Sequence, residues 1–189
     1  MRRAMTSMLL AASTMAVAAC HHAPPRAMPV PNAANMLVNT AWLAEHRNDA
    51  DLVMLHVGTK AQYDSGHVAG ARHTTLDEIS LPTVPGGLSL QMAGVAQLTA
   101  WAERNGIGNS TRVIVIPHDG SLQSATRVFF TLAYLGAMDR ISLLDGGYLA
   151  WQREARATST TAPAPVASGA VTFTPSLRPD LIATIAQVE

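Results

Sequence analysis

The sequence has little cysteine and no net charge. Its 189 residues include one cysteine, Cys20, and 13 basic residues balance 13 acidic ones. A single cysteine allows no disulfide within the chain. No more than two arginines are adjacent, so the chain lacks the basic patch that nucleic acids bind. We therefore expect no nucleic-acid partner.

A membrane-spanning apolar run is also absent from the N-terminus. The chain opens with MRRAMTSMLLAASTMAVAAC, in which Arg2 and Arg3 precede an apolar, alanine-rich stretch from Met8 to Ala19. This stretch is too short and too rich in alanine for a membrane span, and the arrangement is typical of a targeting signal. Residues 1–20 are predicted to be a signal peptide.

The signal peptide ends in Val17-Ala18-Ala19-Cys20, which resembles the bacterial lipobox. There the cysteine is diacylated and becomes the new N-terminus, and two or three acyl chains anchor a protein stably. This resemblance implies a membrane partner through lipidated Cys20 and a place on the periplasmic side of the cell envelope. His21, rather than an acid, favours the outer membrane over the inner. The alternative is ordinary secretory cleavage with Cys20 incidental.

Residues 21–36 contain four prolines and no periodic pattern, which predicts an extended tether. His21 and His22 could bind a metal, but adjacent histidines in a tether more often have no ligand role. We expect neither a metal nor a cofactor.

Strand and helix patterns alternate from Leu37 onward. Leu52–Val57 is a short apolar run, as expected of a strand buried on both faces. Thr59-Lys60-Ala61-Gln62 fits a capping box, and Gly146–Gly147 suits a turn that needs positive φ. The alternation predicts an α/β fold with a doubly wound parallel sheet.

The stretch VIVIPHDGSLQSATR, residues 113–127, indicates a strand, a loop and a helix, an arrangement that often carries chemistry in α/β enzymes. A helix N-terminus with backbone N–H groups favours an anion, so a small anion is a candidate ligand. Asp119 would repel it, Ser121 or Ser124 would otherwise cap the helix, and Arg127 would otherwise tie the helix to the sheet. The candidate site residues of this loop are His118, Asp119, Gly120, Ser121, Gln123, Ser124 and Arg127.

Three segments resemble the rhodanese domain family. LVNTAWLAEH is similar to its opening strand and helix, YDSGHVAGA to its Tyr-x-x-Gly-His-Ile-Pro-Gly-Ala signature, and the stretch ending in DGGYLAW to its Asp-Gly-Gly-x-x-x-Trp motif. The resemblance covers residues 37–156 and implies a rhodanese-like doubly wound parallel sheet with helices on both faces. Beside it, we expect His67 to be a structural histidine, and Tyr148 and Trp151 to pack as one core-facing pair.

Resemblance to this family implies sulfurtransferase chemistry. A loop cysteine takes a sulfane sulfur from thiosulfate or 3-mercaptopyruvate as a persulfide and passes it to a thiophilic acceptor. Here Pro117 stands at the cysteine position, or His118 if the alignment slips by one, and neither can form a persulfide. His56 and Gly58 replace the acid and cation of the family's Leu-Asp-Val-Arg, and Ala69 replaces a proline. The loop is therefore vestigial, and we expect no catalysis by this chain alone.

Tandem rhodaneses lose the same cysteine from their N-terminal half, while the second half is catalytic. Residues 157–170 have the composition of a linker. Residues 171–189 resemble the join and the start of a second domain, and Leu181-Ile182-Ala183-Thr184 weakly repeats Leu37-Val38-Asn39-Thr40. The first hypothesis is thus a lipoprotein pseudoenzyme, the structural half of a tandem sulfurtransferase whose second domain is truncated.

Two other hypotheses stay open. One is a free-standing anion- or partner-binding lipoprotein domain of the cell envelope. The other is an unrelated enzyme that uses His118 and Asp119 as an acid/base pair, although adjacent loop residues rarely reach the same proton.

Overall fold

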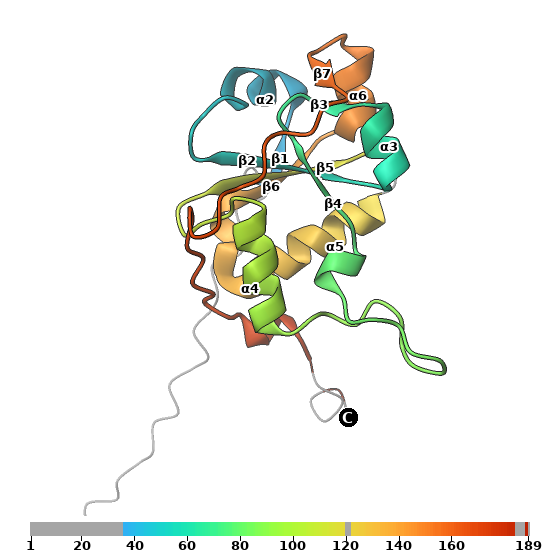
Figure 1. Cartoon of the computed structure of the whole chain (residues 1–189), viewed down its shortest axis with the longest axis vertical. Helices are drawn as coiled ribbons and strands as arrows, with labels where there is room; N and C mark the ends of the chain where they lie inside the picture. The colour runs from blue at the N-terminus through green and yellow to red at the C-terminus, as the bar shows by residue number, and fades with distance from the viewer. Residues whose placement is uncertain (1–35, 120–121, 184–187, 189) are drawn as a thin grey trace, which may run out of the picture. The chain divides into compact units, whose positions relative to one another are not determined.

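A computed structural model describes residues 36–119, 122–183 and 188. Five parallel strands form one sheet in the order β1-β6-β5-β2-β4 (Figure 1). The strands are β1 (Leu37–Val38), β2 (Leu52–Val57), β4 (Arg72–Thr74), β5 (Arg112–Pro117) and β6 (Ile141–Leu144). The predicted α/β class with a doubly wound parallel sheet is confirmed.

Helices cover both faces of the sheet, as expected (Figure 1). On one face Met54, Ile114 and Ile116 pack with α2 (Thr40–His46) and α6 (Gly147–Arg153). On the other face, residues one position along the same strands pack with α4 (Val95–Arg104) and α5 (Leu122–Leu132). Successive strand residues point to opposite faces, so a strand covered on both sides must be apolar throughout. This explains the apolar run Leu52–Val57.

Local sequence signals place the helix starts. Asn39 caps α2, and its side chain accepts a hydrogen bond from the backbone N–H of Trp42. The capping box at Thr59 opens α3 (Lys60–Ser65), with both reciprocal hydrogen bonds to Gln62 present. A turn at Gly146 and Gly147, with φ of 72° and 58°, opens α6. The capping box and the glycine turn were predicted from the sequence.

Single-turn helices complete the second half of the fold. A 3-10 turn, η1 (Asp77–Ile79), follows β4. The end of α5 continues into η2 (Ala133–Ala137), a π-helical turn, and η3 (Met138–Arg140). No helix in the described part of the chain is long and apolar enough to cross a membrane.

Residues 157–183, here called the strap, run across the domain. Thr158–Ser159 form β7, which pairs antiparallel with β3 (His67–Val68). This strand lies in the stretch whose composition predicts a linker, and the sequence patterns did not indicate it. Farther along, Phe173 is buried in the core with α4 and α5. The strap therefore packs on the domain along most of its length.

The end of the strap lies beside η2. The backbone N–H of Ser176 donates to the carbonyl of Leu135 at 3.0 Å, and that of Arg178 donates to Tyr134 at 2.8 Å. Pro179–Leu181 form the 3-10 turn η4. Residues 171–189 include the stretch that resembles the start of a second domain. In this structure the part of it around residues 173–178 contacts the first domain. The signal peptide, residues 1–20, and the tether up to residue 35 lie outside the described residues.

Candidate functional site

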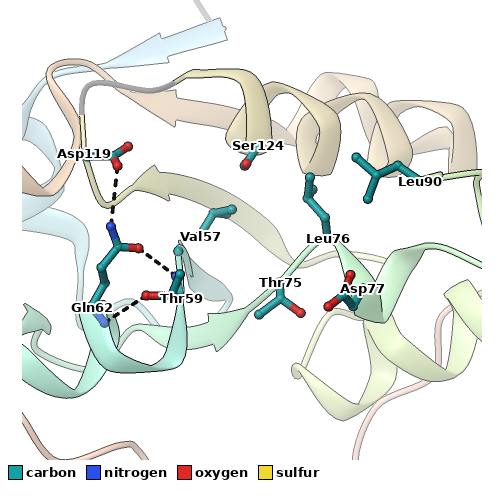
Figure 2. Close-up of a pocket in the computed structure, with 10 residues that line it drawn as sticks. Val57, Thr59, Gln62, Thr75, Leu76, Asp77, Leu90, Asp119 and Ser124 are labelled. Carbon is teal, nitrogen blue, oxygen red and sulfur yellow. Dashed lines mark hydrogen bonds between the residues drawn. The ribbon is translucent and has the colours of Figure 1, made fainter. Parts of the chain in front are cut away.

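A pocket of about 600 Å³ opens where β2, β4 and β5 end, at the carboxyl edge of the sheet. This edge is where ligands bind in open α/β sheets. Ten residues line the carboxyl-edge pocket (Figure 2): Val57, Gly58, Thr59, Gln62, Thr75, Leu76, Asp77, Leu90, Asp119 and Ser124. Of the predicted loop residues, Asp119 and Ser124 are in this lining.

The capping box of α3 builds one wall of the pocket. Gln62 accepts a hydrogen bond from the Thr59 backbone N–H at 2.8 Å, and its Nε2 donates to Asp119 at 3.5 Å (Figure 2). A motif that starts a helix thus also connects that helix to the loop after β5. Both the oxygen and the nitrogen of the Gln62 side-chain amide therefore make hydrogen bonds, one to the helix start and one to the loop.

The lining carries negative charge. Asp77, at the start of η1, and Asp119 contribute two carboxylates, and none of the lining residues is basic. The remaining polar groups are neutral hydroxyls and one amide. Two carboxylates oppose the binding of an anion, although the start of α5 at this edge favours one.

His118 lies in a different place from Asp119. Its Nδ1 is 3.0 Å from Nε2 of His56, and its ring stacks on Tyr148 with centroids 5.3 Å apart. It is not among the residues that line the pocket. Burial lowers its pKa, and the charge of Asp119 opposes that shift. His118 therefore belongs to a packed aromatic cluster, while Asp119 faces the pocket, and the two do not converge on one proton.

His56 is the centre of that cluster. It is fully buried on β2, and its ring contacts those of Tyr63, His67, His118 and Tyr148. Burial, reinforced by the neighbouring histidines, lowers its pKa from 6.5 to about 3. His56 is therefore neutral at pH 7, where the family pattern would have an ionised acid.

Pro117 occupies the position at which the family resemblance places the cysteine, and its surroundings are closely packed. Pro117 is the last residue of β5, is buried, and lies opposite Val57 on β2. A Cβ on Gly147 would lie 2.5 Å from the Pro117 carbonyl oxygen. The turn that opens α6 thus rests directly against the end of β5.

The other predicted loop residues are spread around the pocket. Arg127 donates from Nη2 to the Leu90 carbonyl at 3.0 Å, so it holds the loop before α4 rather than the start of α5. Gln123 is exposed and does not line the pocket. Gly120 and Ser121 lie outside the described residues. Arg127 is therefore not a lining residue, but it holds the backbone of Leu90, which is one.

His67 has the geometry of a structural histidine. Its Nδ1 lies 2.9 Å from the Tyr63 carbonyl and its Nε2 lies 3.3 Å from the Thr161 carbonyl in the strap. Its ring stacks on Tyr63 with centroids 3.7 Å apart. Tyr148 and Trp151 are both buried in one core cluster, and Trp151 donates from Nε1 to Ala157 at 2.9 Å. His67 and Trp151 thus hold the strap in place.

Sequence reasoning missed several residues of this edge. Thr75, Leu76 and Asp77 line the pocket although the sequence around them shows no motif. Asp77 lies only a few residues after the YDSGHVAGA segment, and an acid so close to that segment was the signal in the sequence that could have indicated it. Among the described residues, no three His, Cys, Asp or Glu side chains are grouped to hold a metal ion.

The parallel sheet, covered by helices on both faces, and its carboxyl-edge pocket define an open α/β protein. A sequence model described as the rhodanese-like domain matches residues 39–154, more than half of the chain. The chain therefore belongs to the rhodanese-like domain family. It is homologous to 3-mercaptopyruvate sulfurtransferases. It is 28% identical over 141 residues to the Homo sapiens enzyme of that name, a match that covers 67% of this chain and 46% of the human protein.

Solved structures show the same fold. The chain superposes on SseA from Escherichia coli, described as a 3-mercaptopyruvate sulfotransferase, with a TM-score of 0.70 and 24% identity, covering 82% of this chain and 60% of SseA. For 3-mercaptopyruvate sulfurtransferase from Leishmania major the TM-score is 0.61 and the identity 18%, covering 77% and 41% of the two chains. The present chain thus spans about half the length of these relatives.

Proposed function

We propose that this chain is a non-catalytic rhodanese domain, the structural half of a tandem sulfurtransferase. The observation that carries this proposal is Pro117 at the position where the family has its cysteine. Persulfide chemistry needs a thiolate as nucleophile, and proline has none. The only cysteine, Cys20, precedes the domain by many residues.

The charge of the carboxyl-edge pocket supports the same conclusion. Thiosulfate and 3-mercaptopyruvate are anions, whereas the pocket presents Asp77 and Asp119 and no basic side chain. An anionic donor would enter against two carboxylates, both on exposed residues, so the repulsion acts at close range and weakens with added salt. The same argument speaks against an anion-binding role for this loop.

A sulfurtransferase assay tests the proposal. The full chain should transfer no sulfur from thiosulfate or 3-mercaptopyruvate to cyanide above the no-enzyme blank, while human 3-mercaptopyruvate sulfurtransferase serves as a positive control. The variant Pro117→Cys should also remain inactive with both donors, because the carboxylates still oppose them. Turnover by the wild-type chain would refute the proposal.

The tandem arrangement is supported by the share of each relative that this chain covers, 46% of the human protein and 60% of SseA. We propose that residues 37–156 form the first domain, residues 157–170 the connection and residues 171–189 the beginning of the second, with Phe173 of that last stretch packed in the core of the first domain. Translation of the DNA beyond codon 189 should then give a rhodanese sequence with a cysteine in its loop. Unrelated sequence in every frame would contradict this.

We further propose that residues 1–20 are a lipoprotein signal and that Cys20 anchors the domain to the periplasmic side of the cell envelope, in the outer membrane. Support comes from Val17-Ala18-Ala19-Cys20 and the proline-rich residues 21–36. Metabolic labelling with an alkyne fatty acid should label the wild-type protein and not Cys20→Ala. Equal labelling of both would exclude lipidation at Cys20.

A further inference from the structure

A second pocket, of about 490 Å³, opens at the opposite side of the sheet, near the amino ends of β2 and β4. It lies between the turn after α2, the starts of these strands and the strap. The family match does not assign it a role. The amino-edge pocket is lined by Arg47, Asn48, Ala50, Leu52, Val53, Met54, Ala69, Gly70, Arg72, Gly106, Val166 and Val171.

Its only charged lining residues are two arginines. Arg47 follows α2, Arg72 begins β4, and both are half-buried. Within the described residues neither has an ion-pair partner, and no acid lines the pocket. Asp49 and Asp51 belong to the same turn as Arg47 but are exposed and outside the lining. The pocket therefore brings together two cations without a counter-charge.

Most donors of these guanidinium groups are available. Arg72 uses Nη1 to donate to the Ala164 carbonyl in the strap at 3.0 Å, a bond that also fixes the direction of its side chain. Each guanidinium has five N–H donors and no acceptor. A carboxylate matches their geometry and charge, because it accepts charge-assisted, bidentate hydrogen bonds from a guanidinium group.

The walls beside the arginines are apolar. Leu52 and Met54 line it from one face of β2 and Val53 from the other, and Val166 and Val171 of the strap complete the apolar lining. Gly106, with a φ of 79°, lies between Val53 and Val166, and a Cβ there would come within 3.4 Å of Val166. That distance is an ordinary van der Waals contact, so the positive φ after α4 accounts for the glycine, and Val53 and Val166 lie close to each other around it.

From these observations we propose that the amino-edge pocket binds a small organic carboxylate with an apolar body. Arg47 and Arg72 bind the carboxylate, and the β2 and strap side chains contact the apolar part. A concave site with mainly apolar walls and a few convergent charged groups is the usual form of a small-molecule site. This proposal concerns a separate site and does not depend on whether the carboxyl-edge pocket is catalytic.

Titration of the full chain with hexanoate, followed by NMR and calorimetry, tests the proposal. Hexanoate should saturate, with amide shifts centred on residues 47–54, 70–72 and 166–171. Hexanamide, which has the same chain without the charge, should bind at least tenfold more weakly, since the charge-assisted bonds are lost. Equal affinity of the two probes would overturn the proposal, because an apolar cavity would then explain the binding.

Variants separate the arginines from a general effect of charge. Arg47→Gln and Arg72→Gln should each weaken hexanoate binding about tenfold, and Arg72→Lys should recover part of the loss. Arg153→Gln removes an equal charge from the exposed face of α6 and should leave the affinity unchanged. Circular dichroism checks that each variant is folded. Unchanged affinity in folded Arg47→Gln and Arg72→Gln, or saturating shifts at the carboxyl edge alone, would refute the assignment.

Discussion

The two pockets lie at opposite ends of β2 and β4 and differ in charge. The carboxyl-edge pocket has Asp77 and Asp119 and no basic residue, whereas the amino-edge pocket has Arg47 and Arg72 and no acid. In an open α/β sheet the carboxyl edge is the expected ligand site. In this chain that edge has the charge that disfavours the family's anionic sulfur donors.

The difference shows that a fold places a site without deciding its chemistry. Strand order and the β5–α5 connection bring the loop to the carboxyl edge, but single side chains in the loops set the charge there. Three properties of the carboxyl edge can be changed one at a time: its backbone support, the protonation of the histidine beneath it and its lining charge.

The largest effect is expected from the backbone beneath the carboxyl edge. Gly147 has a φ of 58°, and a Cβ there would lie 2.5 Å from the Pro117 carbonyl oxygen, so Gly147→Ala adds both backbone strain and a clash. It should lower the free energy of unfolding by about 3 kcal/mol, measured by urea denaturation.

The matched control lies in the strap near the amino edge. Gly169 has a φ of 75°, but a Cβ there meets no atom within 4 Å. Gly169→Ala should therefore cost only about 1 kcal/mol, from the backbone conformation alone. Equal losses in the two variants would show that contact with Pro117 does not hold the edge.

Acid should act on the carboxyl edge through His56. Its pKa falls from 6.5 to about 3 on folding because burial disfavours the charged ring. Between these pH values the unfolded chain binds a proton at His56 that the folded chain does not bind, so acidification favours unfolding. The stability contributed by neutral His56 is therefore complete above pH 6.5 and is lost as the pH falls towards 3. At pH 5 the loss should be about 2 kcal/mol.

Urea denaturation of the wild type and of His56→Gln at pH 7.5 and pH 5 measures this effect. The variant should lose less stability on acidification, because glutamine does not titrate. An identical loss in both proteins would assign the acid sensitivity to other groups. No histidine lines the amino-edge pocket.

The smallest effect is expected from the lining charge. Asp77→Asn combined with Asp119→Asn should strengthen thiosulfate binding at the carboxyl edge by about tenfold, because two repulsive charges are removed. Asp139→Asn, an exposed acid outside the pocket, is the control. Chemical shifts during a thiosulfate titration report the affinity. If the double variant and the control behave alike, lining charge does not exclude the sulfur donor.

Local patterns predicted most of the fold. The Thr59–Gln62 capping box marks its helix start by short-range hydrogen bonds, and Leu52–Val57 shows the apolar run of a strand covered on both faces. These features depend on residues close in the sequence, and for that reason the sequence alone reveals them. Family resemblance then supplied the order of the elements.

Side-chain directions at the site could not be predicted in the same way. Arg127 reaches Leu90 and His118 reaches His56, which are distant in the sequence. The amino-edge pocket joins Arg47 and Arg72 from two separate elements. Such juxtapositions depend on tertiary packing, and the low-complexity strap has no periodic pattern that would place it.

The burial of Phe173 has a consequence for where the chain can be shortened. The last strand of the sheet ends at Leu144, but the core beside α4 and α5 also contains Phe173, from the strap. A boundary drawn at the end of the matched family segment would therefore keep every strand of the sheet and remove a residue that closes its core. Incompletely packed domains expose apolar surface and aggregate. The strap thus belongs to the folding unit, and a chain cut ahead of Phe173 should keep an apolar side open to solvent.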